Sequence, residues 1–344
     1  MKVLVTGGAG FLGTELVIRL IKNKSEVIAF DRIPKDNVRL PKQCIYVEGD
    51  ITEFQRYEKI VGRIDCVYHC AAALPISKSE TSFRDTNVFG TEKVLETSLR
   101  NKVRKVIFIS TSAVYTPNKA LLPITEETEL SPCGRYGKSK YDAEQIVQRY
   151  KKKGLDCSII RPRTILGKGR LGIFQILFEW IGEDKNVYLI GDGNNLFQFI
   201  GLGDLVEGII LAGTKPCKNQ DFNMGAERYG TVREDLGWLI KKVKSMSRIV
   251  GVNAIAARTV LMALDKLNLS PLVDWHYMTP NVPFYFDTKK SRDILGWKPK
   301  EANRDLLLET YNWYNKMDKS SLHYGKTHSS IQKQGILKLV KMFS

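Results

Sequence analysis

Residues 1–31 contain the feature that most constrains the fold of this 344-residue chain. Residues 2–6 form a short apolar run with β-branched side chains, a glycine-rich segment follows at 7–13, and residues 11–22 carry apolar side chains at helical spacing. Residues 26–31 form a second apolar run. Because two neighbouring parallel strands need a helical crossover, this part of the chain is predicted to be a βαβ unit.

The alternation of short strands and helices continues to about residue 162. Further strands are expected near residues 44–47, 65–69, 105–110 and 156–160, with a helical stretch after each. This order predicts an α/β fold with a doubly wound, Rossmann-like parallel sheet. We therefore assign residues 1–162 to a dinucleotide-binding domain whose sheet is completed by later strands.

From residue 163 the pattern changes to glycine-rich segments and separate helices, including 204–212 and 233–244. Residues 163–314 are predicted to form mainly a smaller, C-terminal substrate lobe. Residues 315–344 form a basic tail in which apolar side chains share one helical face opposite Lys338 and Lys341. This tail is expected either to make peripheral contact with a membrane surface or to pack as a solvated end on its own domain.

The chain is strongly basic, with 53 Lys and Arg against 37 Asp and Glu, a net charge of +16. This charge favours anionic partners such as nucleotides, phosphosugars or membrane surfaces. Nucleic-acid binding is not expected, since the charge is spread along the chain and no segment resembles a base-reading module.

The six cysteines lack a Cys-x-x-Cys pair and the four histidines lack metal-ligand spacing, so neither a disulfide framework nor a metal site is expected. With no secretory or membrane-spanning segment, a cytoplasmic location is expected.

The glycines at positions 7, 10 and 13 lie between the first strand and the first helix. A tight turn at this place brings backbone N–H groups and the positive helix end against a pyrophosphate, with Phe11 and Leu12 beside it. Asp31 ends the second strand, where its carboxylate can accept hydrogen bonds from the adenosine ribose and favours NAD over NADP. NADP stays possible because Arg32 could pair with a 2′-phosphate.

Small or short side chains follow the third and fourth strands at the same edge of the sheet. Asp50 and Ile51 follow the third strand, and Ala71 and Ala72 follow the fourth. Their positions at carboxyl ends of strands predict that they line the adenine and ribose of the cofactor.

Oxidation of an alcohol by a nicotinamide needs a group that takes the hydroxyl proton, and a tyrosine can do so when a nearby lysine lowers its pKa. Tyr-x-x-x-Lys places both side chains on one helical face, and it occurs here as Tyr115/Lys119, Tyr136/Lys140 and Tyr285/Lys289. The first pair is interrupted by Pro117, and the third lies in extended chain. Tyr136 and Lys140 lead into an amphipathic helix and are the candidate pair. The strand ending at Ser110 adds the hydroxyls of Thr111 and Ser112 at the sheet edge.

Together these motifs resemble the extended short-chain dehydrogenase/reductase family, with the NAD-dependent epimerase/dehydratase group that acts on nucleotide sugars as the most similar branch. The resemblance covers residues 1 to about 315 and rests on the following segments: 6–13, Asp31, Asp50–Ile51, 69–72, Asn87–Thr91, 110–115, 136–140, Arg161–Pro162, 191–193, 222–225 and 295–299.

The resemblance implies roles for individual residues. Tyr136 is the catalytic base or acid, Lys140 its pKa partner and a ligand of the nicotinamide ribose, and Thr111 the third catalytic residue. Asn87 is implied in the hydrogen-bond network around the cofactor, and Pro162 joins the cofactor-binding set. Homodimers are implied through helices near residues 86–100 and 138–153.

Two departures from the family narrow the chemistry. Ser112 and Ala113 stand where the dehydratase branch has Asp and Glu, so dehydration is not expected. No arginine occurs between Asp192 and Asp204, where many relatives have one that binds the nucleotide diphosphate. Either another basic residue binds the phosphates or the substrate has none. The substrate-binding candidates are Ser112, Lys168, Arg170 and Arg228.

The sequence therefore predicts an NAD-dependent epimerase or oxidoreductase that acts on a secondary alcohol, most simply C4 of a nucleotide sugar. One alternative is a 3β-hydroxysteroid-type or lipid alcohol dehydrogenase, favoured by the missing arginine, the apolar stretch 174–180 and the tail. A catalytically silent nucleotide-binding protein is a third interpretation, although such a protein has no need of Tyr136, Lys140 and Thr111 together.

Overall fold

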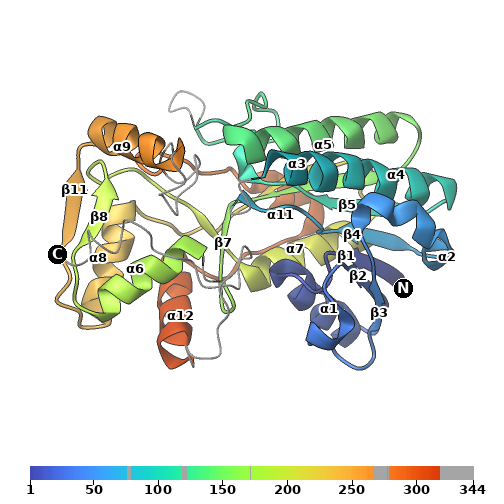
Figure 1. Ribbon diagram of the computed structural model, residues 1–344, viewed down its shortest axis with the longest axis horizontal. Helices are drawn as coiled ribbons and strands as arrows, with labels where there is room; N and C mark the ends of the chain where they lie inside the picture. Colours follow the sequence, from blue (N-terminus) through green and yellow to red (C-terminus); the bar gives the residue numbers. More distant parts are fainter. Residues whose placement is uncertain (76–78, 118–121, 171, 267–276, 278, 318–344) are drawn as a thin grey trace.

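The structure is a computed structural model that describes residues 1–75, 79–117, 122–170, 172–266, 277 and 279–317. Its larger part is built on a seven-stranded sheet, and its smaller part is a lobe of helices and short strands (Figure 1). The tail prediction for residues 315–344 falls almost entirely outside the described residues.

All pairings in the seven-stranded sheet are parallel, and the strand order is β10-β6-β5-β4-β1-β2-β3. The order reverses between β1 and β4, and a crevice forms at such a reversal, beyond the carboxyl ends of the strands. The predicted doubly wound fold is confirmed. The strands are β1 (Lys2–Thr6), β2 (Glu26–Asp31), β3 (Ile45–Glu48), β4 (Cys66–His69), β5 (Lys105–Ile109), β6 (Cys157–Pro162) and β10 (Asp221–Met224).

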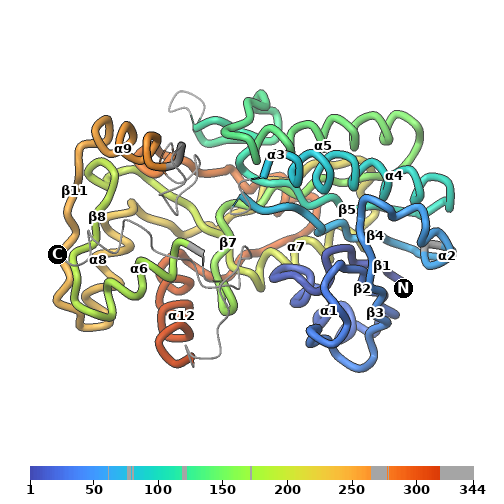
Figure 2. The backbone as a smooth tube through the Cα atoms, in the orientation of Figure 1, coloured from blue at the N-terminus to red at the C-terminus, as the bar shows by residue number. Residues whose placement is uncertain are grey.

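Helices cover both faces of this sheet (Figures 1 and 2). Each face has its own apolar core. The core on one face contains side chains of α1 (Phe11–Lys22) and α7 (Leu202–Thr214). The core on the other face contains side chains of η2 (Ile51–Tyr57), α4 (Thr91–Arg100) and α5 (Gly134–Lys152). Shorter elements connect them: η1 (Lys35–Asn37), α2 (Glu58–Val61), α3 (Glu80–Ser82), η4 (Phe83–Gly90), η5 (Ser112–Val114) and α11 (Lys289–Leu295).

The second lobe faces the carboxyl ends of the sheet strands and has a third apolar core. Two short parallel pairs, β7 with β9 and β8 with β11, lie among its helices. Its elements are β7 (Thr164–Leu166), α6 (Gly172–Gly182), β8 (Val187–Ile190), β9 (Phe199–Gly201), α8 (Val232–Lys242), β11 (Ile249–Val252), α9 (Ala254–Lys266) and α12 (Asn303–Lys316).

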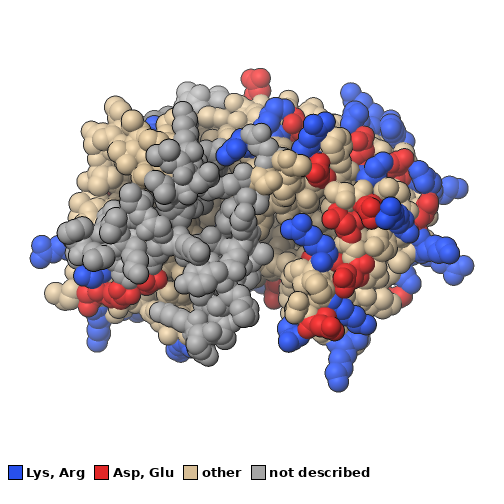
Figure 3. Space-filling view, in the orientation of Figure 1, with Lys and Arg blue, Asp and Glu red and all other residues tan. Residues whose placement is uncertain are grey.

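On the face shown in Figure 3, most of the visible Lys and Arg side chains lie over the part that contains the seven-stranded sheet, where they are interspersed with Asp and Glu. Among the described residues, none of the helices combines the length and the apolar character that crossing a bilayer requires.

The homodimer through residues 86–100 and 138–153 stays a prediction. These segments lie on η4, α4 and α5, and α4 packs beside α5.

Candidate active site

A cavity of about 1380 Å³ lies between the sheet edge and the second lobe. Its volume exceeds the 300–1,000 Å³ or so of a typical ligand pocket, which leaves room for a dinucleotide and a second ligand. Most residues predicted to form the site line this one cavity: Gly7, Gly10, Phe11, Leu12, Gly13, Asp31, Arg32, Asp50, Ile51, Ala71, Ala72, Thr111, Ser112, Tyr136, Lys140, Pro162 and Arg170.

The turn between β1 and α1, with Gly7, Gly10 and the first-turn glycine Gly13, forms a glycine corner that is closely packed. Gly7 has a φ of +70°, which a glycine adopts without strain. A Cβ on Gly13 would overlap the carbonyl oxygen of Gly7 and lie 2.8 Å from the Cα of Gly8. The first turn of α1 contains no acidic residue, and no side chain caps it. The positive end of this helix therefore remains available to an anion in the cavity.

Two carboxylates lie along the same side of the cavity. Asp31 accepts a hydrogen bond from the backbone N–H of Ala9 over 3.0 Å, which ties the end of β2 to the glycine corner. Asp50 accepts one from the backbone N–H of Thr52 over 2.8 Å and caps η2. Arg32 is exposed at the cavity rim. These residues fit a dinucleotide whose diphosphate lies on the glycine corner and whose adenosine lies near Asp31 and Asp50.

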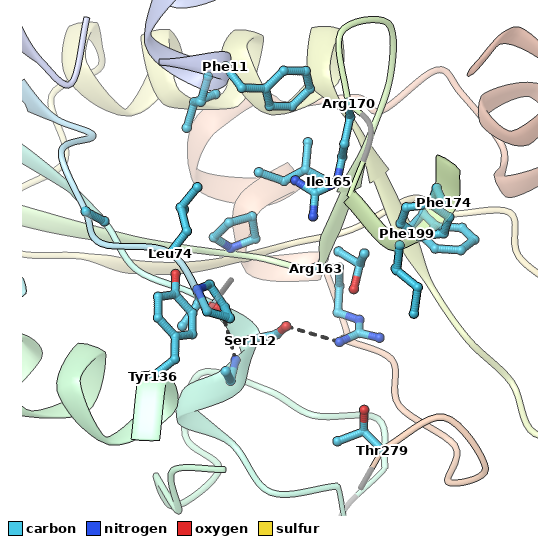
Figure 4. A pocket seen from close by; sticks show the side chains of 18 of the residues that line it. Phe11, Leu74, Ser112, Tyr136, Arg163, Ile165, Arg170, Phe174, Phe199 and Thr279 are labelled. Atoms are coloured by element: carbon cyan, nitrogen blue, oxygen red, sulfur yellow. Dashed lines mark hydrogen bonds between the residues drawn. The ribbon is translucent and has the colours of Figure 1, made fainter. Parts of the chain in front are cut away.

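Tyr136 and Lys140 lie on the first two turns of α5. This end of α5 packs closely against the loop after β5, because a side chain on Gly137 would overlap the carbonyl oxygen of Ala113. The phenol of Tyr136 projects into the cavity (Figure 4). Burial raises the pKa of Tyr136 to about 12, whereas a hydrogen bond with the side chain of Thr111 and the charge of Arg170 lower it.

Lys140 is fully buried, and its ammonium donates a hydrogen bond to the carbonyl of Ile109 over 2.7 Å. Burial lowers the pKa of Lys140 to about 7, while the charge of Glu144 acts in the opposite direction. Among the described residues, the cation that acts on the Tyr136 phenol is Arg170 and not Lys140. This differs from the expected pairing, because the Lys140 side chain runs toward β5.

Asn87 lies behind the cavity and does not line it. Its amide oxygen accepts a hydrogen bond from the backbone N–H of Ala73 over 2.7 Å, and its amide nitrogen donates one to Ser139 over 2.9 Å. Asn87 therefore joins the loop after β4 to the helical turn that carries Tyr136 and Lys140. Its contacts are those of a positioning residue.

Two of the predicted substrate-binding residues lie outside the cavity lining. Lys168 is exposed and forms an ion pair with Glu309 of α12 over 2.8 Å. Arg228 is exposed and lies 3.6 Å from Asp305. Only Arg170 of the three basic candidates lines the cavity.

Sequence reasoning missed Arg163, which directly follows β6 and lines the cavity. Its side chain is 1% exposed, and its guanidinium carbon lies 3.9 Å from the ring centre of Phe284. Nη1 donates a hydrogen bond to the Ser112 hydroxyl over 3.2 Å (Figure 4). The signal in the sequence was a second arginine at the carboxyl end of a predicted strand, two positions after Arg161.

No group of three or more His, Cys, Asp or Glu side chains that could hold a metal ion occurs in the described part of the chain. His69 is buried between the hydroxyls of Thr6 and Thr91, and burial lowers its pKa to about 3. It is therefore a neutral core residue.

Comparison with known proteins decides the family. The model of the NAD dependent epimerase/dehydratase family matches residues 3–225. The chain belongs to this family. It is 34% identical to the uncharacterized protein y4nG of Sinorhizobium fredii, over 98% of this chain and 85% of that protein. It is 29% identical to a UDP-glucose 4-epimerase of Lactobacillus helveticus, over 91% of this chain and 97% of that one.

A solved structure of the family has the same fold. The UDP-glucose 4-epimerase of Thermotoga maritima, crystallised with UDP-glucose, superposes with a TM-score of 0.75 at 27% identity and covers 92% of this chain and 99% of its own. The resemblance inferred from the sequence is thereby confirmed. As a member of the NAD-dependent epimerase/dehydratase family, the protein is an enzyme of the nucleotide-sugar epimerase type.

Proposed function

We propose that this enzyme oxidises a secondary alcohol of a nucleotide sugar, most simply at C4, to a ketone and then reduces it again, with inversion of configuration as the net result. The observation that carries the proposal is the meeting of the Tyr136 phenol with the side chain of Thr111 inside the cavity. The similarity to UDP-glucose 4-epimerases supports the same reaction and a UDP-linked substrate.

The residues of the cavity fit NAD, the cofactor of the family. The glycine corner and the N-terminus of α1 would hold the diphosphate, Asp31 the adenosine ribose, and Asp50 with Ile51 the adenine side. Ala71, Ala72 and Pro162 offer small surfaces along the same wall. When bound, NAD supplies a hydride acceptor and donor. Asp31 favours NAD, and Arg32 at the rim leaves NADP as a weaker alternative.

Side chains of the protein would transfer the proton of the reacting sugar hydroxyl. Tyr136 would take the proton from the sugar hydroxyl during oxidation and return it to the ketone oxygen during reduction. Because its pKa is about 12, the phenol is protonated at neutral pH and ready to donate. The charge of Arg170 favours the phenolate that the opposite direction requires. Thr111 would hold the substrate oxygen beside the phenol, and Lys140 would bind the nicotinamide ribose.

The direct test incubates the purified protein and NAD with UDP-glucose, UDP-galactose and their uronic acid counterparts, and follows epimer formation by NMR. Interconversion of one epimer pair is expected. Thermal denaturation with the same nucleotide sugars and with sterols separates the proposal from a steroid or lipid alcohol dehydrogenase, because a ligand that binds only the native state raises its melting temperature. Stabilisation by a sterol and by none of the nucleotide sugars would overturn the proposal.

A further inference from the structure

Arg163 is a buried cation that has no counter-ion in the part of the chain that the structure describes. It is 1% exposed, and the ionisable group that acts on its charge is the phenol of Tyr229 and not a carboxylate. Burial lowers the pKa of Arg163 only to about 9, so the guanidinium is charged at neutral pH. A buried charge is costly unless a partner of opposite charge or a set of hydrogen bonds compensates it.

Within the described ranges, one of the three guanidinium nitrogen atoms of Arg163 has a hydrogen-bond acceptor. Nη1 donates to Ser112, whereas Nε and Nη2 are buried and no described residue offers them an acceptor. These two nitrogen atoms form one edge of the planar group, and their parallel N–H bonds match the two oxygens of a carboxylate. Three aromatic rings, those of Phe197, Phe284 and Phe286, lie 3.9–5.6 Å from the guanidinium carbon and restrict its plane.

The position of this edge indicates which end of a substrate it meets. Arg163 donates a hydrogen bond to Ser112, which directly follows Thr111, and the Thr111 side chain is hydrogen-bonded to Tyr136. Arg163 therefore lies at the reacting end of the cavity. In a nucleotide-linked hexose the diphosphate is attached at C1, across the ring from C4. In a uronic acid the carboxylate is attached at C5, next to C4. A guanidinium beside the reacting hydroxyl is therefore better placed for the carboxylate than for the diphosphate.

We propose that Arg163 determines the specificity of this enzyme by binding a carboxylate next to the reacting carbon, so that the substrate is a nucleotide-linked uronic acid. The inference rests on the proposed function. Because Nε and Nη2 are covered by neighbouring side chains, the carboxylate pairs with both only when a cavity-lining side chain moves aside. A neutral hydroxymethyl group at the same place leaves at least one of these N–H groups without an acceptor, which disfavours neutral hexoses.

The test compares the wild-type enzyme with Arg163→Met, which has a flexible apolar side chain that can fill part of the same space. Arg292→Met is the matched control, since Arg292 is exposed, pairs with Glu227 and lies outside the cavity. For each protein, kcat/KM is measured with UDP-glucuronate and with UDP-glucose, and dissociation constants for both sugars and for UDP are measured by calorimetry. The melting temperature of each variant reports whether it folds.

The expected result is that Arg163→Met lowers the preference for UDP-glucuronate over UDP-glucose by about 10- to 100-fold, the range for a lost hydrogen bond to a charged group. Arg292→Met should keep the wild-type preference. If Arg163→Met does not fold, Arg163→Lys, which keeps the charge but loses the two parallel N–H bonds, should lower the preference in the same direction.

Three results would overturn the inference. An unchanged preference in a folded Arg163 variant would make the residue structural. Equal weakening of UDP-glucuronate, UDP-glucose and UDP would assign Arg163 to the diphosphate. A wild-type enzyme that epimerises UDP-glucose but neither binds nor converts UDP-glucuronate would refute the uronic acid while leaving the proposed function intact, whereas failure with every nucleotide sugar would refute both.

Discussion

The glycine corner allows a sharp test with two matched substitutions, Gly13→Ala and Gly237→Ala. Both glycines lie within helices, α1 and α8. Alanine is favoured over glycine in a helix interior by about 1 kcal/mol, so each substitution should stabilise the fold by that amount if nothing is in the way. A Cβ on Gly237 has its first neighbour 3.8 Å away, at the side chain of Ile249, which is an ordinary contact.

At Gly13 the added Cβ would meet backbone atoms, which cannot move unless the rest of the glycine corner moves with them. It would overlap the carbonyl oxygen of Gly7 and lie 2.8 Å from the carbonyl carbon of Gly7 and the Cα of Gly8. Overpacking of this kind costs about 1–3 kcal/mol, and relief requires the corner to open. Because the same corner would present its N–H groups to the diphosphate, NAD affinity should fall with stability.

Urea denaturation and calorimetric titration with NAD measure the two effects, on protein freed of any co-purified dinucleotide. Gly237→Ala is expected to raise the free energy of unfolding by up to about 1 kcal/mol and to leave NAD affinity unchanged. Gly13→Ala is expected to lower the free energy of unfolding and to weaken NAD binding at least about tenfold, or 1.4 kcal/mol. If Gly13→Ala binds NAD as tightly as the wild type, the corner does not hold the diphosphate.

Two further predictions concern buried charges. Glu144→Gln should destabilise the fold by about 1–3 kcal/mol in urea denaturation. Glu144 binds the buried guanidinium of Arg161 through both oxygens, and without its charge that guanidinium keeps only Asp221, 3.3 Å away, as a counter-ion among the described residues. An unchanged free energy of unfolding would contradict this. His69 should make the fold less stable as pH falls from about 6.5 toward 3, by at most about 1.4 kcal/mol per pH unit, since its folded pKa is about 3 and the unfolded chain binds the proton first. His69→Gln should remove that part of the slope, and an unchanged slope would show that other groups cause it.

Much of the fold could be predicted from local sequence because short-range patterns specify it. The run before Gly7, the helical repeat after it and the short strand that ends at Asp31 specify β1, α1 and β2 without knowledge of the rest of the chain. The pairing of β10 with β6 is different, since it joins residues about 60 positions apart and depends on packing that no local pattern encodes. The helices α7 and α8 show both sides of this. Their bounds differ from the expected ranges by only a few residues, because local periodicity specifies a helix, whereas their place in the fold depends on long-range packing and could not be derived.

The residues of the candidate site also differ in how far the sequence alone could place them. Tyr136, Thr111 and the glycine corner could be placed in one cavity because each follows or opens a predicted element at the carboxyl edge of the sheet. Lys168 could not be assessed from the sequence, since its pairing with Glu309 depends on where α12 packs. Arg163 was overlooked because its environment of three phenylalanine rings comes from segments far apart in the chain.

The role of Tyr136 in proton transfer is tested most directly by Tyr136→Phe, measured as epimerisation turnover together with the dissociation constants for NAD and the nucleotide sugar. Removal of the hydroxyl alone should reduce turnover by a factor of about 10²–10⁴, the usual contribution of a positioned acid or base, and should leave both dissociation constants near their wild-type values. Turnover close to that of the wild type would show that another group moves the proton.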